Sequence, residues 1–553
     1  PRRGCRSTAW STTWPGGCLP DGPSDLLTRL PGSVASEVAG QTDVVEHLDD
    51  LRRLVADAVA ADSAEARWSA VAAVPPSLVE ALLHAGMQGG DDLELLGTGV
   101  AASPGAASGV LCLTAEAVLD ASDRGEAAVL VREETTPADE IGMQLAEGIV
   151  TARGGMASHA AVVARGWGVP AVVGLTDLLV SGDHVVLGGR RIDEGSPISL
   201  DGTTGEVFAG AAGVAAAAEV PELDVLLGWA DEVRGDRVGV RANADRADDA
   251  ARARAFGAEG IGLCRTEHMF LGDRLPIIRR FMLATDPDEE AAALDELGAV
   301  QRLDLAGVLE AMAPLPVTVR LLDAPLHEFL GDDSPLGSEH NPMLGERGIR
   351  LAVMREGLYR MQTRALLAAM ADVRESGSHP NAAVMLPLVS TSAELELVRG
   401  WVLDEIAAAA PAEPPLVGTM IETPRAALLA GEMARHADFF SFGTNDLTQM
   451  VFGFSRDDVE QRIMGEYLSR GLLPDNPFEK LDPGAVAPLV AAATRAGRLA
   501  HPDLEVGVCG EHGGDPTSIH LLVAAGIDYV SCSPFRVPVA RLAVAQALIS
   551  LDA

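Results

Sequence analysis

The chain has 553 residues, of which 48% are hydrophobic and 22% charged, a length and composition typical of two to four folded domains rather than of a disordered protein. Its 42 basic and 80 acidic residues give a net charge of −38, so neither a nucleic acid nor an anionic membrane is expected as a partner. No apolar run approaches the ~18 residues of a membrane span, and the first residues lack the apolar stretch of a secretion signal. These features predict a cytoplasmic protein.

Cysteine and lysine usage excludes further kinds of site. The six cysteines contain no CxxC pair, which argues against a disulfide framework and a structural zinc site. Cys509 and His512 have the spacing of half a metal site, but no second pair completes it. Lys480 is the only lysine and follows no Gly-rich run, so a Walker-type phosphate loop is excluded.

The N-terminal part divides into an irregular and a helical segment. Residues 1–42 are rich in Pro, Gly, Ser and Thr and are predicted to be irregular or disordered. Residues 43–94 carry apolar side chains at three- and four-residue spacing, which predicts a short helical segment with too little core to stand alone.

Residues 95–210 are predicted to form a compact α/β domain. Helical stretches alternate there with short β-rich runs at Ala128–Arg132, Gly148–Thr151, Pro170–Gly174 and His184–Leu187, a pattern typical of such domains. The following residues, 211–235, begin with an Ala- and Gly-rich run and are predicted to be a linker on which the α/β domain can swivel.

Residues 236–553 contain eight strand–helix repeats. Their apolar runs are Val238–Ala244, Gly260–Arg265, Pro316–Asp323, Ala383–Val389, Leu416–Glu422, Phe439–Asn445, Glu505–Gly510 and Tyr529–Pro534. Eight such units predict a (β/α)₈ TIM barrel, in which active-site residues lie at the C-terminal ends of the strands. The predicted fold is therefore α/β, a swivelling domain followed by a TIM barrel.

A histidine stands at a predicted helix start in the α/β domain. Gly154 and Gly155 form a tight turn after a strand, and a helix begins near Ser158, so His159 lies in its first turn. Free backbone N–H groups and the positive end of the helix dipole favour an anion at that place. His159 is therefore a candidate to carry a phosphoryl group, although a histidine at a helix start is more often a surface or capping residue.

Charged residues gather at the predicted strand ends of the barrel. Arg265 and Arg320 lie at the ends of the second and third strands, and Arg347 follows in the next segment. Guanidinium groups in such places suit phosphate and carboxylate ligands. Two carboxylates, Glu422 and Asp446, end the fifth and sixth strands and could share Mg²⁺ with a substrate phosphate.

The seventh predicted strand ends at Cys509. A thiol at that position could donate a proton if its pKa were tuned by its surroundings. The simpler interpretation is a small buried hydrophobe, which is what most free cysteines are.

The motifs that carry these residues resemble those of the pyruvate, phosphate dikinases, members of the phosphoenolpyruvate (PEP)-utilising enzymes. The similar segments are GGMASHAAVVARGWG, GIGLCRTEHMF, RLLDAPLHEFL, NPMLGERGIRL, FFSFGTNDLTQMVFGFSRDD, CGEHGGDP and YVSCSPFRVPVARLA. They stand in the family's order and extend over about residues 95–550.

The resemblance implies a role for each candidate. His159 matches the histidine that accepts the phosphoryl group, and Cys509 matches the acid that protonates the enolate of pyruvate. Arg265 and Arg320 match residues that hold the phosphate of PEP, and Arg347 matches a further arginine on the substrate side. Glu422 and Asp446 match the Mg²⁺ ligands, and they border the substrate together with Gly443, Thr444 and Asn445.

The resemblance also implies substrates and partners. The expected reaction interconverts PEP and pyruvate through phosphohistidine, with Mg²⁺ as cofactor and a homodimer formed through the barrel. No segment resembles the family's N-terminal nucleotide-binding domain, so the ATP half-reaction would need an upstream segment or a separate ATP-binding subunit.

Two other functions stay open at this point. The chain could donate its phosphoryl group to a carrier protein, as the first enzyme of the sugar phosphotransferase system does. It could also be a non-catalytic PEP-binding protein, although a sensor would need neither His159 nor Cys509.

Overall fold

Eight parallel strands in the C-terminal half close into a barrel, because the first strand pairs with the last. The computed structural model describes residues 41–88, 93–136, 139–155, 158–215, 220–270, 272–330, 341 and 344–552. The strands, in barrel order, are β14 (Gly239–Asn243), β15 (Ile261–Arg265), β16 (Pro316–Arg320), β17 (Asn381–Leu386), β18 (Leu416–Ile421), β19 (Phe439–Phe442), β20 (Glu505–Val508) and β21 (Tyr529–Cys532). The predicted TIM barrel and the order of its strands are confirmed.

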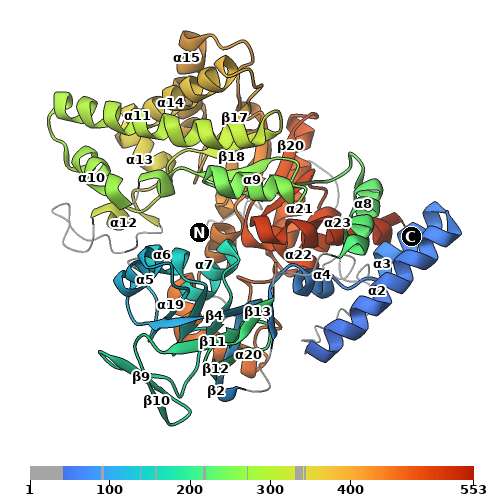
Figure 1. Cartoon of the computed structure of the whole chain (residues 1–553). Helices are drawn as coiled ribbons and strands as arrows, with labels where there is room; N and C mark the ends of the chain where they lie inside the picture. Colours follow the sequence, from blue (N-terminus) through green and yellow to red (C-terminus); the bar gives the residue numbers. More distant parts are fainter. Residues whose placement is uncertain are drawn as a thin grey trace, which may run out of the picture.

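Helices surround this barrel on its outer side (Figure 1). The α-helices are α9 (Ala247–Ala255), α10 (Leu275–Leu283), α11 (Pro287–Met312), α12 (Leu326–Leu330), α13 (Ile349–Met354), α14 (Glu356–Glu375), α15 (Ser392–Ala409), α16 (Pro424–Leu428), α17 (Ala430–Met433), α18 (Thr444–Phe452), α19 (Arg456–Val459), α20 (Gly465–Ser469), α21 (Val486–Ala500), α22 (Pro516–Ala524) and α23 (Val537–Asp552). Short 3₁₀ turns follow three strands: η3 (Glu267–Phe270), η8 (Glu511–Gly514) and η9 (Pro534–Arg536).

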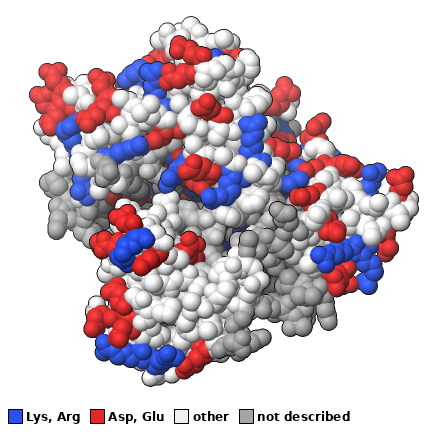
Figure 2. Space-filling model, viewed as in Figure 1, with Lys and Arg blue, Asp and Glu red and all other residues white. Residues whose placement is uncertain are grey.

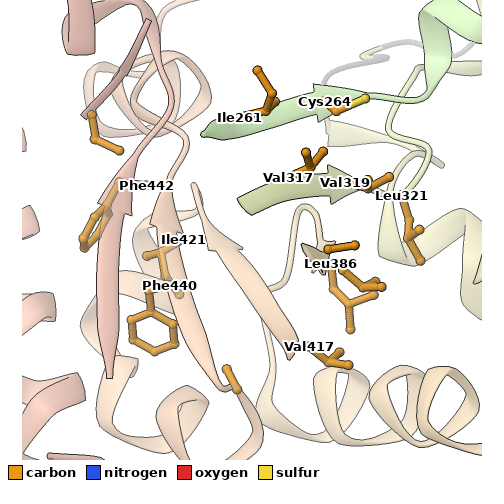
Figure 3. Close-up of a cluster of buried hydrophobic side chains, with 14 of the residues drawn as sticks. Ile261, Cys264, Val317, Val319, Leu321, Leu386, Val417, Ile421, Phe440 and Phe442 are labelled. Atoms are coloured by element: carbon orange, nitrogen blue, oxygen red, sulfur yellow. The ribbon is translucent and has the colours of Figure 1, made fainter. Parts of the chain in front are cut away.

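Alternation along each strand separates two apolar layers. Val317, Val319 and Leu321 recur at two-residue intervals and join the large core beneath the helices (Figure 3). The residues between them face the other way, as the period of a strand requires. A second, small cluster fills the barrel interior with Leu263, Met385, Met420, Phe439 and Cys509.

The α/β domain before the barrel contains an eight-stranded mixed sheet, in the order β2-β12-β11-β4-β5-β6-β7-β3. Its strands are β2 (Glu94–Thr98), β3 (Val100–Ser103), β4 (Ala106–Cys112), β5 (Ala128–Arg132), β6 (Gly148–Thr151), β7 (Ala171–Val173), β11 (Pro197–Asp201) and β12 (Glu206–Ala209). One face packs against helices α5 (Ala115–Asp123), α6 (Glu140–Leu145) and α7 (His159–Trp167). The other packs against a small sheet of β8 (Leu179–Val180), β9 (His184–Leu187) and β10 (Arg190–Asp193).

The two chain segments that enter and leave the α/β domain run side by side. Strand β1 (Gly86–Gln88) pairs in antiparallel fashion with β13 (Gly213–Ala215). The predicted linker 211–235 thus begins with a strand, and its second half is helix α8 (Pro221–Arg234), whose Leu226 and Ala230 are fully buried. The linker stays a prediction; within it, apolar side chains at helical spacing pack residues 221–234 against helix α23 of the barrel.

Helix α8 belongs to a layer at the side of the barrel (Figure 1). It shares one apolar cluster with α2 (Gln41–Ala61), α3 (Ala64–Ala73), α4 (Pro76–Leu82) and α23. The N-terminal helices therefore complete their core with the C-terminal helix of the barrel. Of the segment 1–42 that was predicted to be irregular, residues 1–40 lie outside the described residues, and the last two residues belong to helix α2.

One described stretch, Pro534–Asp552, meets the length and hydropathy criterion for a membrane span, with a mean hydropathy of 1.2. A run of this kind was not expected from the sequence. Within the structure, 61% of it is buried, and its apolar side chains pack in the barrel core and in the layer with α8. Core packing therefore accounts for its composition.

Gly507 provides a test of the packing inside the barrel. A Cβ atom at this position would lie 2.0 Å from Cζ of Tyr529, a fully buried side chain. We expect Gly507→Ala to reduce stability by about 2 kcal/mol through overpacking, measured as a lower midpoint of thermal unfolding. Gly400→Ala is the matched control, because a Cβ there contacts nothing within 4 Å and alanine favours helix α15 by roughly 0.5–1 kcal/mol. An unchanged midpoint for Gly507→Ala would contradict the described packing.

Candidate active site

The polar residues predicted at strand ends meet at one mouth of the barrel. Arg265 and Arg320 are the last residues of β15 and β16, which pair in parallel and in register there. Glu422 follows β18, Gly443 follows β19, and Cys509 follows β20. Because the strands are parallel, their carboxyl ends lie on the same side of the barrel.

A buried ion cluster is centred on Asp323. Arg347 donates two hydrogen bonds to this carboxylate, with Nε–Oδ1 and Nη2–Oδ2 distances of 2.8 and 2.7 Å. Nη1 of Arg320 lies 3.3 Å from Oδ2, and Arg320 also pairs with Glu267. Burial would raise the pKa of Asp323, but the two arginines outweigh it and hold the pKa below its usual value. The cluster keeps both guanidinium groups charged and fixed.

Two further carboxylates adjoin this cluster. Glu422 accepts a 2.6 Å hydrogen bond from the backbone N–H of Leu388, and burial together with the charges of Asp323 and Asp446 raises its pKa to about 8. Burial also raises the pKa of Asp446, against the opposing charge of Arg347. A Cβ on Gly443 would lie 2.6 Å from Oε2 of Glu422, so glycine is needed for this close approach.

The carboxylates of Glu422 and Asp446 are suitable ligands for a divalent cation. Burial raises the pKa of both carboxylates even though Nη1 of Arg347 lies 3.4 Å from Oδ1 of Asp446, and Mg²⁺ prefers carboxylate oxygen ligands. Within the described part of the chain, no three His, Cys, Asp or Glu side chains are grouped to hold a metal by themselves. A magnesium ion here would therefore also need oxygen atoms from its substrate.

Thr444 and Asn445 support the loop that follows Cys509. The Thr444 hydroxyl lies 2.8 Å from Nδ1 of His512, whose Nε2 is 3.0 Å from the carbonyl oxygen of Pro477. Asn445 accepts a hydrogen bond from the backbone N–H of Glu511. Since both ring nitrogens of the fully buried His512 are engaged, it cannot complete a metal site with Cys509.

The Cys509 thiol lies inside the barrel beneath these loops. It is 2% exposed, and Sγ lies 3.7 Å from the carbonyl oxygen of Phe442. Burial raises its pKa to about 11. At neutral pH the group is therefore a protonated thiol, which suits a proton donor better than a nucleophile.

A cavity of about 900 Å³ separates the barrel mouth from the α/β domain. Arg265 and Asn243 line it from the barrel, and Val163, Gly166 and Trp167 of α7 line it from the other side. The Asp323 cluster and Cys509 are not among the described lining residues, because they are packed deeper. On the face shown in Figure 2, arginine side chains lie among acidic ones, in keeping with the net charge of −38.

Helix α7 begins at His159, close to the predicted position. Ser158 is its N-cap and accepts a hydrogen bond from the N–H of Ala161. The structure describes only the backbone of His159, and Val163 follows it by one helical turn. At the other end of α7, Gly168 (φ +69°) leaves space for the Phe535 ring, which a Cβ would approach to 2.3 Å. The helix is thus docked on the barrel.

Two family profiles match the chain. One, described as "PEP-utilising enzyme, PEP-binding domain", covers residues 223–549, and another, "PEP-utilising enzyme, mobile domain", covers residues 125–205. The first match alone covers more than half of the 553 residues. The chain belongs to the PEP-utilising enzymes.

This PEP-utilising enzyme is similar to plant proteins of about twice its length. It is 47% identical over 514 residues to pyruvate, phosphate dikinase 1, chloroplastic, of Arabidopsis thaliana, with 87% of this chain and 53% of the relative covered. It is 47% identical over 486 residues to the chloroplastic enzyme of Flaveria bidentis, with 82% and 51% covered. The chain spans about half the length of the curated relatives it matches.

The likeness to one solved structure is weak. A citrate lyase from Burkholderia xenovorans LB400 has 15% identity and a TM-score of 0.33, with 55% of this chain and 76% of that chain covered. A similarity of this size carries no argument about function.

Sequence reasoning missed the acidic partners of the arginines. Asp323 comes three residues after Arg320, and Glu267 two residues after Arg265. Asp323 directly follows an apolar pair, the same signal that pointed to Glu422, whereas Glu267 comes two residues after the end of its strand. Their pairing with Arg347 and Arg320 depends on loops from different strands and could not be read from spacing.

Removing the charge of Asp323 tests the ion cluster of this PEP-utilising enzyme. Asp323→Asn would leave two buried guanidinium groups with less compensating charge, and we expect a loss of about 3 kcal/mol or more, seen as a lower urea midpoint. Asp372→Asn is the control, because Asp372 pairs with Arg302 at the partly exposed surface, where an ion pair contributes about 1 kcal/mol or less. Equal effects of the two substitutions would contradict a central role for Asp323.

Proposed function

We propose that this chain transfers a phosphoryl group between PEP and His159 and releases pyruvate, the PEP-dependent half of a pyruvate, phosphate dikinase reaction. The observation that supports this most directly is the grouping at one barrel mouth. Arginines, two carboxylates of raised pKa and a buried thiol lie there, across a cavity from the helix that begins with His159.

The arginines would bind the phosphate and offset the charge that develops during transfer. Arg265 is the arginine at the cavity wall, while Arg320 and Arg347 are held in fixed orientations by Asp323. As the P–O bond of PEP breaks and a P–N bond to His159 forms, the electron pair stays on the enolate oxygen. Fixed positive groups stabilise such an oxyanion without reorganising.

Cys509 would then deliver a proton to C3 of the enolate. The raised pKa keeps the proton on sulfur until a strongly basic carbon is presented. The C–H bond forms, pyruvate results, and the thiolate regains a proton from solvent. In the reverse direction the thiolate removes a methyl proton from pyruvate.

Glu422 and Asp446 would hold Mg²⁺, which would supply positive charge to the oxygens of PEP. Gly443 permits the position of the Glu422 carboxylate. Thr444 and Asn445 fasten the loop after Cys509 through His512 and Glu511. These three residues thereby border the proposed substrate site.

The ATP half-reaction is assigned in this proposal to a further segment or a separate ATP-binding subunit, in line with the greater length of the relatives. Homodimer formation through the barrel and a cytoplasmic location stay predictions from the sequence.

The half-reaction can be tested with PEP labelled on its phosphate, in the presence of Mg²⁺. We expect acid-labile, base-stable label on the protein with stoichiometric pyruvate, and no label on His159→Ala. Cys509→Ala should slow the exchange of pyruvate methyl protons for deuterium by at least about 100-fold, measured by NMR.

Cys532→Ala provides the control, because Cys532 is a buried thiol at the end of the neighbouring strand β21 and should leave the exchange unchanged. Binding of PEP without any label would contradict the proposed transfer and favour a PEP-binding sensor. Label that passes only to a small carrier protein would favour the phosphotransferase-system alternative.

Mg²⁺ binding should release protons. With its pKa at about 8, Glu422 is largely protonated at pH 7, and a metal ligand must be deprotonated. Calorimetric titration of Mg²⁺ with PEP at pH 7, in buffers of different ionisation enthalpy, should show proton release in the native chain. Glu422→Gln should abolish the release and weaken Mg²⁺ binding. Release that persists in this variant would contradict the assignment of Glu422.

A further inference from the structure

One buried carboxylate holds two cationic side chains at the cavity wall. Asp245, in the loop after β14, accepts a short hydrogen bond from the backbone N–H of Arg265. Its Oδ2 lies 2.7 Å from Nδ1 of His268 and 3.9 Å from Nη1 of Arg265. Asp245 thereby fixes both the end of β15 and the imidazole ring in η3.

The ring of His268 is oriented toward the cavity. Because Nδ1 faces Asp245, the opposite nitrogen, Nε2, points away from that carboxylate. Within the described part of the chain, no hydrogen bond to Nε2 is formed, the side chain is 51% exposed, and it lines the cavity beside Arg265. His512 differs from His268 in both respects: it is fully buried, and both of its ring nitrogens have hydrogen-bond partners. His512 therefore has a structural role.

The surroundings favour a charged ring. Burial would lower the pKa of His268, but the hydrogen bond and charge of Asp245 and the charge of Glu267 outweigh burial and the opposing charge of Arg265, so the pKa is raised. The carboxyl group of Glu328 also interacts electrostatically with this ring. Two positive groups thus share Asp245 as their common counterion.

Helix α7 faces this pair across the cavity. Val163, Gly166 and Trp167 line the same space as Arg265 and His268, and His159 precedes Val163 by one turn on the same helix. Any phosphoryl group passing between the barrel mouth and α7 enters this space.

We propose that His268 is a phosphate-binding residue, whose Nε2–H donates a hydrogen bond to the phosphoryl group held by Arg265, and that Asp245 is its positioning residue. This inference rests on the proposed function, because it takes PEP as the ligand. Charge-assisted hydrogen bonds of this kind are stronger than neutral ones.

The proposal predicts a characteristic dependence on pH. A histidine with a raised pKa is charged below that pKa, so its contribution to binding is present at lower pH and is lost as pH rises through it. The phosphate of PEP is fully ionised above about pH 7, since the second pKa of phosphate esters is near 6. Ionisation of Glu422 changes Mg²⁺ binding in the same range, but it is common to the native chain and to a His268 variant.

The test is calorimetric binding of PEP with Mg²⁺ between pH 7 and 9.5, with His268→Gln compared with the native chain. We expect the ratio of their Kd values to be about tenfold at pH 7, as for one charge-assisted hydrogen bond, and to approach one at pH 9.5. In Asp245→Asn, the pH at which the contribution of His268 is lost should move lower. His379→Gln is the control, because His379 is exposed in the loop before β17.

The outcomes distinguish the role of His268 from the proposed phosphoryl transfer. A Kd ratio of one at every pH would overturn the role of His268. A ratio above one that does not change with pH would also overturn it, because it would show a structural effect alone. Native chain that binds PEP but forms no phosphohistidine would contradict the proposed transfer, while the Kd ratio still tests His268. Native chain that does not bind PEP at any pH would overturn both.

Discussion

The carboxylate of Asp323 receives two hydrogen bonds from Arg347 and lies 3.3 Å from Arg320. Because this carboxylate is fully buried, neither arginine can rely on water for charge compensation, and each is held where strand ends meet. Burial raises the pKa of Glu422, and the negative charge of Asp323 raises it further. The barrel mouth thus combines arginines in fixed positions with carboxylates of raised pKa, and this combination depends on the interaction of Asp323 with the two arginines.

Docking of the α/β domain is connected to the same loops. Arg165 on α7 is half-buried and interacts electrostatically with Glu511. Glu511 forms an ion pair with Arg456, and its backbone N–H donates a hydrogen bond to Oδ1 of Asn445. Burial opposes ionisation of Glu511, but Arg456 lowers the pKa to about 2. The loop after Cys509 thus meets the helix that begins with His159 on one side and the proposed substrate site on the other.

The connections of the α/β domain fit a body that moves as one unit. Its entering and leaving segments pair as β1 and β13, whereas α8, directly after them, is anchored in the layer with α2–α4 and α23. If the α/β domain swivels, as the sequence predicts, the pivot is expected near this two-stranded ribbon. The cavity between α7 and the barrel is the space that such a displacement would open or close.

The sequence by itself determined the barrel, the order of its strands and the gathering of Arg265, Arg320, Glu422 and Cys509 at one mouth. Apolar runs that end in polar residues are local signals, and parallel strands bring their ends together. Tertiary structure alone decided the pairing of Asp323 with Arg347, the sharing of Asp245 by Arg265 and His268, and the burial of α8. These features join loops and helices far apart in the chain, and their energies come from burial and charge compensation, which local patterns do not contain.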